Sequence, residues 1–234
     1  MKSSIALLSA FLFGTFAQAQ ENISSDTSGD YHLGFRIAPR VSTLGGGLEL
    51  AKGLTPSFGL RGGFNYFSYD YDATESDVSY NLDLELKSFG LFADWHPFKG
   101  AFRISGGFLI NGNGLEGKAK ASGSYDIDGT TYTNAQISSI GLDIDYNTFA
   151  PYLGLGWDTT FGDDDNWGFV FDLGLIYSGS PDAALGIAVV PGSLNATEEQ
   201  QLENHRKNEE SDLQDDLNDF EWWPVVSAGL VYQF

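Results

Sequence analysis

Residues 167–178 read WGFVFDLGLIYS. Every odd-numbered position carries a large apolar side chain, whereas the even-numbered positions include Gly168, Asp172, Gly174 and Ser178. A repeat of two is the period of a β-strand, in which successive side chains point to opposite faces. The stretch therefore predicts a strand with one aromatic face and one face of small and charged side chains.

The same alternation recurs in three further segments. Their apolar faces hold Phe58, Leu60, Gly62, Phe64 and Tyr66; Phe102, Ile104, Gly106, Phe108 and Ile110; and Val226, Ala228, Leu230, Tyr232 and Phe234. The opposite faces are too rich in glycine for an ordinary water-facing surface, yet they carry isolated Arg and Asp residues. This combination fits a narrow barrel with aromatic side chains pointing into lipid and small or paired polar groups inside. The alternative is a soluble aromatic core, in which each buried Trp would need a partner for its N–H group.

The connections between the predicted strands alternate in length. Short turns are expected near residues 51–56, 96–100 and 161–166, and longer polar loops near 71–79, 122–137 and 190–221. Short turns on one side and long loops on the other are typical of outer-membrane barrels. Aromatic residues border both ends and predict two membrane-interface girdles. Those beside the short turns are Trp95, Phe98, Phe102, Trp157, Phe161, Trp167, Tyr232 and Phe234, and those at the other end are Trp222 and Trp223.

The alternation predicts an all-β transmembrane antiparallel barrel of eight strands. The expected strands cover residues 31–39, 42–51, 56–71, 79–97, 101–120, 138–160, 166–189 and 222–234. The first pair is the weak point, because its apolar residues have odd numbers before Pro39 and even numbers from Leu44 onward. Either a turn or a bulge near Ser42 explains this change of parity, and a bulge would alter the strand count, with ten as the alternative.

Composition excludes several classes of protein. The 234 residues include 12 Lys+Arg against 32 Asp+Glu, which gives a net charge of −20 and no basic stripe for nucleic acid. The absence of Cys excludes disulfides, thiolate zinc sites, iron–sulfur clusters and cysteine nucleophiles. Since no apolar run reaches about 18 residues, a helical membrane span is excluded as well.

The N-terminus predicts export. Lys2 precedes an apolar stretch at residues 5–16, and Ala17-Gln18-Ala19 follows. A positive start, a short apolar segment and an A-x-A site form a secretory signal peptide, with an ordinary N-terminal helix as the alternative. We expect residues 1–19 to be the signal peptide and residues 20–234 the barrel domain. No Cys follows the cleavage site, so a lipoprotein anchor is not expected.

The end of the chain resembles the C-terminal signal of Gram-negative outer-membrane proteins. That signal places a terminal Phe after alternating aromatic or apolar residues, and Leu230, Tyr232 and Phe234 match it. The resemblance implies transfer to the barrel-assembly machinery with the help of periplasmic chaperones. It also implies Sec-type export to the outer membrane, where lipid and lipopolysaccharide are the expected partners.

The whole mature chain is similar to the uncharacterised proteobacterial outer-membrane β-barrel proteins, with a broader kinship to OmpA-, OmpW- and Opa-type barrels. Matching stretches are residues 43–45, 94–98, 150–157, 179–181, 213–217, 219–220 and 224–226. The resemblance implies fold and location and carries no functional residues. No OmpA-like periplasmic domain is expected after the last strand.

Four charged residues fall on the small-residue faces and predict a charge network in the lumen: Arg61, Asp94, Arg103 and Asp172. If Trp95 pairs with Phe102 around the turn at residues 96–100, Asp94 lies opposite Arg103. A charge inside a narrow barrel is costly unless it is paired. The alternative places these residues at the periplasmic rim, where an exposed pair contributes little.

Residues that could carry chemistry are few. Among the histidines, His32, His96 and His205, the second is expected to support a turn. His205 shares an acidic loop with Ser193, so an outer-leaflet hydrolase stays open as a minor alternative, although spacing alone shows no triad. The acidic stretches 126–129 and 163–166 offer oxygen ligands but lack the distal Glu of a calcium loop, and turn formation explains them. We therefore predict no catalytic residue, no metal site and no cofactor.

A short acidic helix is expected within residues 197–220, in the last outer loop. Thr197 and Gln200 would form its capping box, and its sparse apolar residues are Leu202, Leu213, Leu217 and Phe220. The helix is placed over the barrel mouth, and the alternative is a solvated charged loop.

Taken together, these features predict a non-enzymatic outer-membrane barrel with a structural or surface-interaction role and a largely filled lumen. The alternative is a porin-like channel for small solutes. Size separates the two, because eight strands leave an interior that side chains nearly fill.

Overall fold

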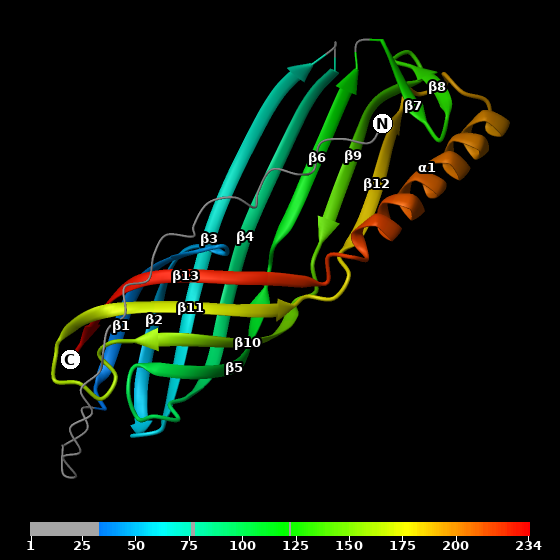
Figure 1. Cartoon of the computed structure of the whole chain (residues 1–234). Coiled ribbons are helices and arrows are strands. Elements are labelled where there is room, and N and C mark those ends of the chain that lie inside the picture. The colour runs from blue at the N-terminus through cyan, green and yellow to red at the C-terminus, as the bar shows by residue number, and fades with distance from the viewer. Residues whose placement is uncertain (1–32, 76–77, 122) are drawn as a thin grey trace, which may run out of the picture. The chain divides into compact units, whose positions relative to one another are not determined.

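The computed structural model describes residues 33–75, 78–121 and 123–234 (Figure 1). The predicted signal peptide, its cleavage site and His32 lie outside the described residues. Within them the chain forms thirteen strands and one helix. The elements are β1 Phe35–Ser42, β2 Gly45–Thr55, β3 Phe58–Glu75, β4 Val78–Trp95, β5 Phe102–Asn111, β6 Gly114–Ala121, β7 Ser124–Ile127, β8 Thr130–Thr133, β9 Ile137–Asp145, β10 Phe149–Asp158, β11 Trp167–Tyr177, β12 Asp182–Val189, α1 Ala196–Leu217 and β13 Trp222–Gln233.

Eight antiparallel strands close into a barrel, as predicted. Their order is β1-β2-β3-β4-β5-β10-β11-β13, and the pairing of β1 with β13 completes the ring. β6, β9 and β12 continue three of these strands after interruptions at residues 112–113, 146–148 and 178–181. The eight-strand count is therefore confirmed. Among the described residues, no helix combines the length and apolar composition that crossing a bilayer requires.

A tight turn explains the change of parity in the first strand pair. Ser42 pairs with Gly45, so each odd residue of β1 lies opposite an even residue of β2. Gly45 has a φ of 104°, and a Cβ there would lie 2.5 Å from the carbonyl oxygen of Tyr66. Only glycine meets both demands easily. The register irregularity lies elsewhere, between Gly53 and Thr55 in the pairing of β2 with β3.

The barrel faces follow the predicted alternation. On β11, Trp167 and Phe169 point outward and are 68% and 67% exposed, whereas Asp172 points into the lumen and is 1% exposed. Two of the predicted girdle residues are placed differently. Phe161 folds under the barrel end and is buried, and Trp223 points inward because its neighbour Trp222 takes the outward position.

The two ends of the barrel differ in height. At the turn end, residues 56–57, 96–101 and 159–166 make short connections. At the loop end, β1, β2 and β13 stop, while β3, β4, β6, β9 and β12 continue as a sheet that rises beyond the closed ring (Figure 1). We call this part the projecting sheet.

Helix α1 lies along β12, the edge strand of the projecting sheet (Figure 1). Its position corrects the expectation of a helix over the barrel mouth. The Glu210 carboxylate accepts from the Leu185 N–H at 2.8 Å, and Arg206 Nη1 donates to the Leu185 carbonyl at 3.0 Å. Gln214 likewise accepts from the Ala183 N–H at 3.1 Å. Side chains of the helix thus pair backbone groups that an edge strand would otherwise leave free.

The N-cap of the helix lies two residues earlier than predicted. Asn195, not Thr197, is the N-cap, and its side chain accepts from the N–H groups of Thr197 and Glu198. The Glu198 carboxylate accepts from the Asn195 N–H at 2.8 Å and completes the capping box. Asn is a stronger N-cap than Thr, which explains the shift.

Candidate functional site

A layer of paired charges crosses the lumen. It contains four arginines and four acids, and their side chains are at most 8% exposed: Arg36, Arg40, Arg61, Arg103, Glu49, Asp94, Asp158 and Asp172. They come from seven strands of the ring, β1 to β5 with β10 and β11. The opposite charges balance in number. We call this group the lumen charge layer.

The structure brings the four predicted residues together. Arg61 Nε lies 3.0 Å from Asp94 Oδ1, and Arg61 Nη1 lies 2.8 Å from Glu49 Oε2. Arg103 Nη2 lies 2.9 Å from Asp172 Oδ1 and 3.1 Å from Oδ2. Because both arginines contact more than one carboxylate, the pairs form one network instead of separate bridges.

The expected register between Asp94 and Arg103 is wrong by two residues. Asp94 lies opposite Ser105, whose hydroxyl donates to it at 2.6 Å, and Trp95 lies opposite Ile104 instead of Phe102. Arg103 Nη1 is 3.8 Å from Asp94 Oδ2. The cause is the stagger of barrel strands, since β5 begins beyond the end of β4 and its first residues pair only with β10.

Gly156 on β10 lets Arg103 reach Asp172, which lies one strand further away on β11. A Cβ at Gly156 would lie 2.1 Å from Asp172 Oδ1 and 2.8 Å from Arg103 Nε. The two charged side chains therefore meet directly above a position that has no side chain.

Sequence reasoning missed half of the lumen charge layer. Arg36 Nη1 binds Asp158 Oδ2 at 2.7 Å, and Arg40 binds both Glu49 and Asp172. The alternation of outward and inward residues along β1 and β2 could have identified three of these charged residues. Arg36 and Arg40 alternate with the outward Phe35 and Ile37, and Glu49 lies between Leu48 and Leu50. The sequence alone left a turn or a bulge possible in the first strand pair, so the faces of these two strands could not be assigned.

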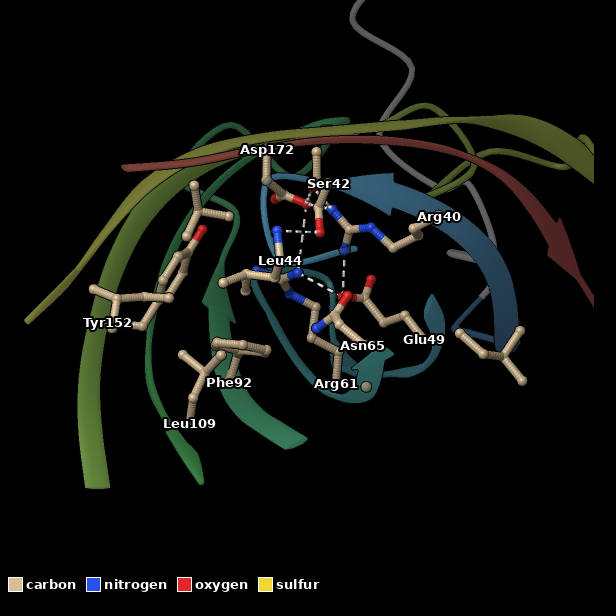
Figure 2. A pocket seen from close by; sticks show the side chains of 15 residues that line it. Arg40, Ser42, Leu44, Glu49, Arg61, Asn65, Phe92, Leu109, Tyr152 and Asp172 are labelled. Carbon is tan, nitrogen blue, oxygen red and sulfur yellow. Dashed lines mark hydrogen bonds and ion pairs between the residues drawn. The ribbon is translucent and has the colours of Figure 1, made fainter. Parts of the chain in front are cut away.

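The lumen leaves little open space beside these charges. A cavity of about 40 Å³ borders Arg40, Glu49, Arg61, Tyr152 and Asp172 (Figure 2). Arg61 Nη2 is buried there without a hydrogen-bond partner in the described protein. A polar cavity needs roughly 10–15 Å³ to hold a water molecule, so this space suits water and not a larger solute.

Apolar and aromatic side chains close both sides of the layer. On the loop side, a buried cluster consists of Leu44, Leu109, Ala150, Tyr152, Ile176 and Val225. On the turn side, the Phe161 ring stacks on the His96 ring at 3.4 Å, and Arg36 Cζ lies 4.9 Å from the Phe161 ring centre. His96 Nδ1 donates to the Gly100 carbonyl at 2.8 Å, as expected of a residue that supports the turn. Burial lowers the pKa of His96.

The other sequence candidates take structural roles. His205 Nδ1 lies 2.9 Å from the Tyr132 hydroxyl, while the Ser193 hydroxyl donates to the carbonyls of Val190 and Gln136. The candidate nucleophile and the candidate base therefore bind different partners instead of each other. Asp128 binds the helix, because its N–H donates to Glu209 and its carboxylate accepts from Asn208, each at 2.7 Å.

The acidic turn at residues 163–166 is held by its own contacts. The Asp164 N–H donates to Asp163 Oδ1 at 2.7 Å, and Asn166 Nδ2 donates to the Gln233 carbonyl at 3.0 Å. In the part of the chain that the structure describes, no group of three or more His, Asp or Glu side chains is arranged to hold a metal ion.

Comparison with known proteins gives matches in structure only. No protein-family model matches the chain, and no curated protein matches it. The crystal structure of Acinetobacter baumannii CarO2 matches with a TM-score of 0.56 and 23% identity, over 86% of this chain and 99% of that one. Acinetobacter baumannii CarO matches with a TM-score of 0.55 and 20% identity, over 88% and 100%.

A third structure is more distant. Ail, the attachment invasion locus protein of Yersinia pestis, has a TM-score of 0.39 and 11% identity. At these identities the two CarO structures inform on fold alone, and the finer kinship to OmpA-, OmpW- and Opa-type barrels stays a prediction. By its closed ring, its apolar outward face and its likeness to the two CarO structures, the chain has the fold of the eight-stranded outer-membrane β-barrel class.

Proposed function

We propose that this protein is an outer-membrane barrel of a Gram-negative bacterium that acts as a surface-interaction protein through its loop end. In this orientation the turn end faces the periplasm and the projecting sheet stands outside the cell. The filled lumen supports a role at the surface over one as a conduit, because paired charges and an apolar cluster leave a cavity of only about 40 Å³ beside the lumen charge layer.

The observation that carries the proposal is an exposed apolar face on the projecting sheet. On β3, Phe67, Tyr69 and Tyr71 are 42%, 54% and 47% exposed. Tyr80 and Leu82 lie beside them on β4 and are also exposed. These side chains continue the lumen-facing side of the strands beyond the ring, away from the bilayer-facing surface. Contiguous exposed apolar side chains in water mark interaction sites.

A free strand edge adjoins this face. The pairing of β2 with β3 ends at Gly46 and Tyr66, whereas the pairing of β4 with β3 runs on to Glu75. In the described ranges, nothing pairs with the other edge of residues 67–75. The opposite edge of the projecting sheet is covered by α1. An unpaired edge is a template for strand addition by a partner.

The charge of the sheet indicates the chemistry of that partner. Asp70 and Asp72 lie on the face opposite the tyrosines, and Asp70 pairs directly with Asp83. The hydrogen bond and the like charge of Asp83 raise the pKa of Asp70. An extended segment with apolar side chains on one face and basic side chains on the other would match both faces of this edge.

Cysteine labelling tests the proposal, because the chain has no Cys of its own. Tyr69→Cys reports on the apolar face, and Ser68→Cys is the matched control on the opposite face. A membrane-impermeant maleimide should label both variants on intact cells. Labelling of Tyr69→Cys should be slower on cells than on the purified protein, with no such difference for Ser68→Cys. Equal rates at position 69 in both settings would count against an occupied face, and no labelling of either variant on cells would refute the orientation.

Two further measurements test the barrel itself. The unboiled protein should migrate differently from the boiled protein on a denaturing gel, and recovery in the soluble periplasmic fraction would refute a membrane barrel. Purified protein in a planar bilayer should show no conductance steps. Steady ion conductance would favour the small-solute channel instead.

A further inference from the structure

An apolar groove runs across the outward surface of β1 to β5, near the turn end. Its volume is about 770 Å³, within the range of roughly 300–1,000 Å³ typical of ligand sites. Three small residues, Gly62, Ala93 and Gly106, form its floor. They adjoin one another because Ala93 pairs with Gly106, and Gly62 lies in the next row opposite Leu91.

Of the two glycines in the floor, Gly106 is not required by the packing of the barrel. A Cβ at Gly106 would meet no atom within 4 Å, whereas a Cβ at its inward-facing neighbour Gly107 would lie 2.1 Å from the Leu91 carbonyl oxygen. Glycine inside a strand weakens it relative to alanine, because the backbone loses more conformational freedom on folding and no side chain packs there. Gly107 is explained by close backbone contact, and Gly106 is explained by neither contact nor strain. Its effect is to deepen the groove.

Lys52 supplies a charge at one end of the groove. Lys52 pairs with Phe35 on one side and Leu60 on the other, and both of these side chains point outward. Its Nζ lies 4.4 Å from the centre of the Phe35 ring. In residues 33–75, 78–121 and 123–234 this ammonium has no carboxylate partner. Arg36 and Arg61 also border the groove, but they point into the lumen and are paired with Asp158 and Asp94.

A cation on the bilayer-facing surface is costly unless it reaches the interface and an anion. We propose that the groove binds one phospholipid of the periplasmic leaflet, with its phosphate on Lys52 and an acyl chain over Gly62, Ala93 and Gly106. The site rests on the outer-membrane orientation proposed above. The ammonium selects the phosphate, and the apolar floor selects the chain, so both parts of the lipid are needed for binding.

Native mass spectrometry of the refolded protein tests this site. The protein is loaded with phosphatidylglycerol and then washed with detergent, and diacylglycerol with the same chains serves as the phosphate-free probe. The wild-type protein should retain one phosphatidylglycerol and no diacylglycerol. Lys52→Gln should weaken retention about tenfold, or about 1.4 kcal/mol, because the charge-assisted contact with the phosphate is lost. Gly106→Leu should abolish it by filling the floor.

Matched variants separate the site from the general lipid surface. Lys87→Gln removes another exposed lysine, and Ala228→Leu adds the same side chain to the outward face of β13. Both should retain the lipid as the wild type does. Equal retention in all variants, or equal retention of diacylglycerol, would overturn the site. A dimer that Gly106→Leu dissociates would assign the groove to a second copy instead. Failure of the wild-type protein to insert into bilayers would refute the membrane proposal itself, which is a different result.

Discussion

Arg103 and Asp172 bind each other across the lumen, although their strands are not neighbours. Arg103 is on β5 and Asp172 on β11, with β10 between them, and Arg103 Nη2 reaches both carboxylate oxygens at 2.9 and 3.1 Å. The contact passes over Gly156 of β10. One buried ion pair thereby ties together three strands of the ring.

Loss of Arg103 should destabilise the barrel strongly. Arg103→Ala removes one of the arginines that neutralise the buried Asp172 carboxylate, and loss of one partner of a buried ion pair typically costs about 3–5 kcal/mol. Adding Asp172→Ala should recover more of this loss than adding Asp94→Ala, because Arg103 Nη2 lies 2.9 Å from Asp172 Oδ1 whereas Arg103 Nη1 lies 3.8 Å from Asp94 Oδ2. Urea unfolding of the protein in lipid vesicles measures all three variants. Simple additivity in both double variants would show that the contact is not energetically coupled.

A methyl group at Gly156 should disturb the same contact. Gly156→Ala places a Cβ 2.1 Å from Asp172 Oδ1, and overpacking of this kind costs about 1–3 kcal/mol. Gly46→Ala is the control, because its Cβ would meet no atom within 4 Å. Samples heated to increasing temperatures before a denaturing gel measure the temperature at which the folded barrel is lost. That temperature should fall for Gly156→Ala only. An equal change in both variants would contradict the proposed crowding.

Acid should weaken the turn that contains His96. Burial lowers the pKa of His96 below its usual 6.5, so the unfolded chain binds the proton more tightly than the folded protein. The contribution of His96 to stability is therefore complete above the pKa of histidine in the unfolded chain, and it is lost as the pH falls below that pKa. His96→Asn keeps a donor for the Gly100 carbonyl and does not titrate. Between pH 8 and pH 5, at roughly the range where histidine titrates, the wild type should lose more unfolding free energy than this variant. Parallel pH profiles would rule out His96 as the source.

Helix α1 should detach from β12 when its edge contacts are removed. Glu210→Ala leaves the Leu185 N–H without its acceptor and also removes a partner of Arg206. Limited proteolysis should then cut residues 196–217 faster, whereas Glu210→Gln should resist because its amide oxygen still accepts. Asp212→Ala, at an exposed position of the same helix, is the control. Faster cleavage in the control as well would point to helix propensity instead of the edge contact.

The last strand should govern assembly. Deletion of Phe234, or Tyr232→Ser combined with Phe234→Ser, removes outward aromatic residues of the predicted assembly signal. Outer-membrane levels of the protein should fall, as measured by fractionation and immunoblotting. Val226→Ser changes the same face outside the terminal signal and should have a smaller effect. Normal levels of the truncated protein would refute the signal.

The sequence by itself determined the strands, their number and their faces. Alternation depends only on local backbone geometry, so residues 167–178 specify an outward aromatic row and an inward Asp172 without knowledge of any neighbour. The same parity rule placed Arg61, Asp94 and Arg103 in the lumen. It also carried the signal for Arg36, Arg40 and Glu49, once the two-residue turn before Gly45 is known.

Only the tertiary structure decided which of these residues meet. Barrel closure and strand stagger set the register between β4 and β5. In that register Arg103 lies farther from Asp94 than from Asp172. The position of α1 was equally hidden, because its side chains pair with an edge of β12 that exists only where the ring ends and the projecting sheet begins. Alternation along a strand is a property of one segment, whereas contacts across a lumen or along an edge depend on how all strands close together.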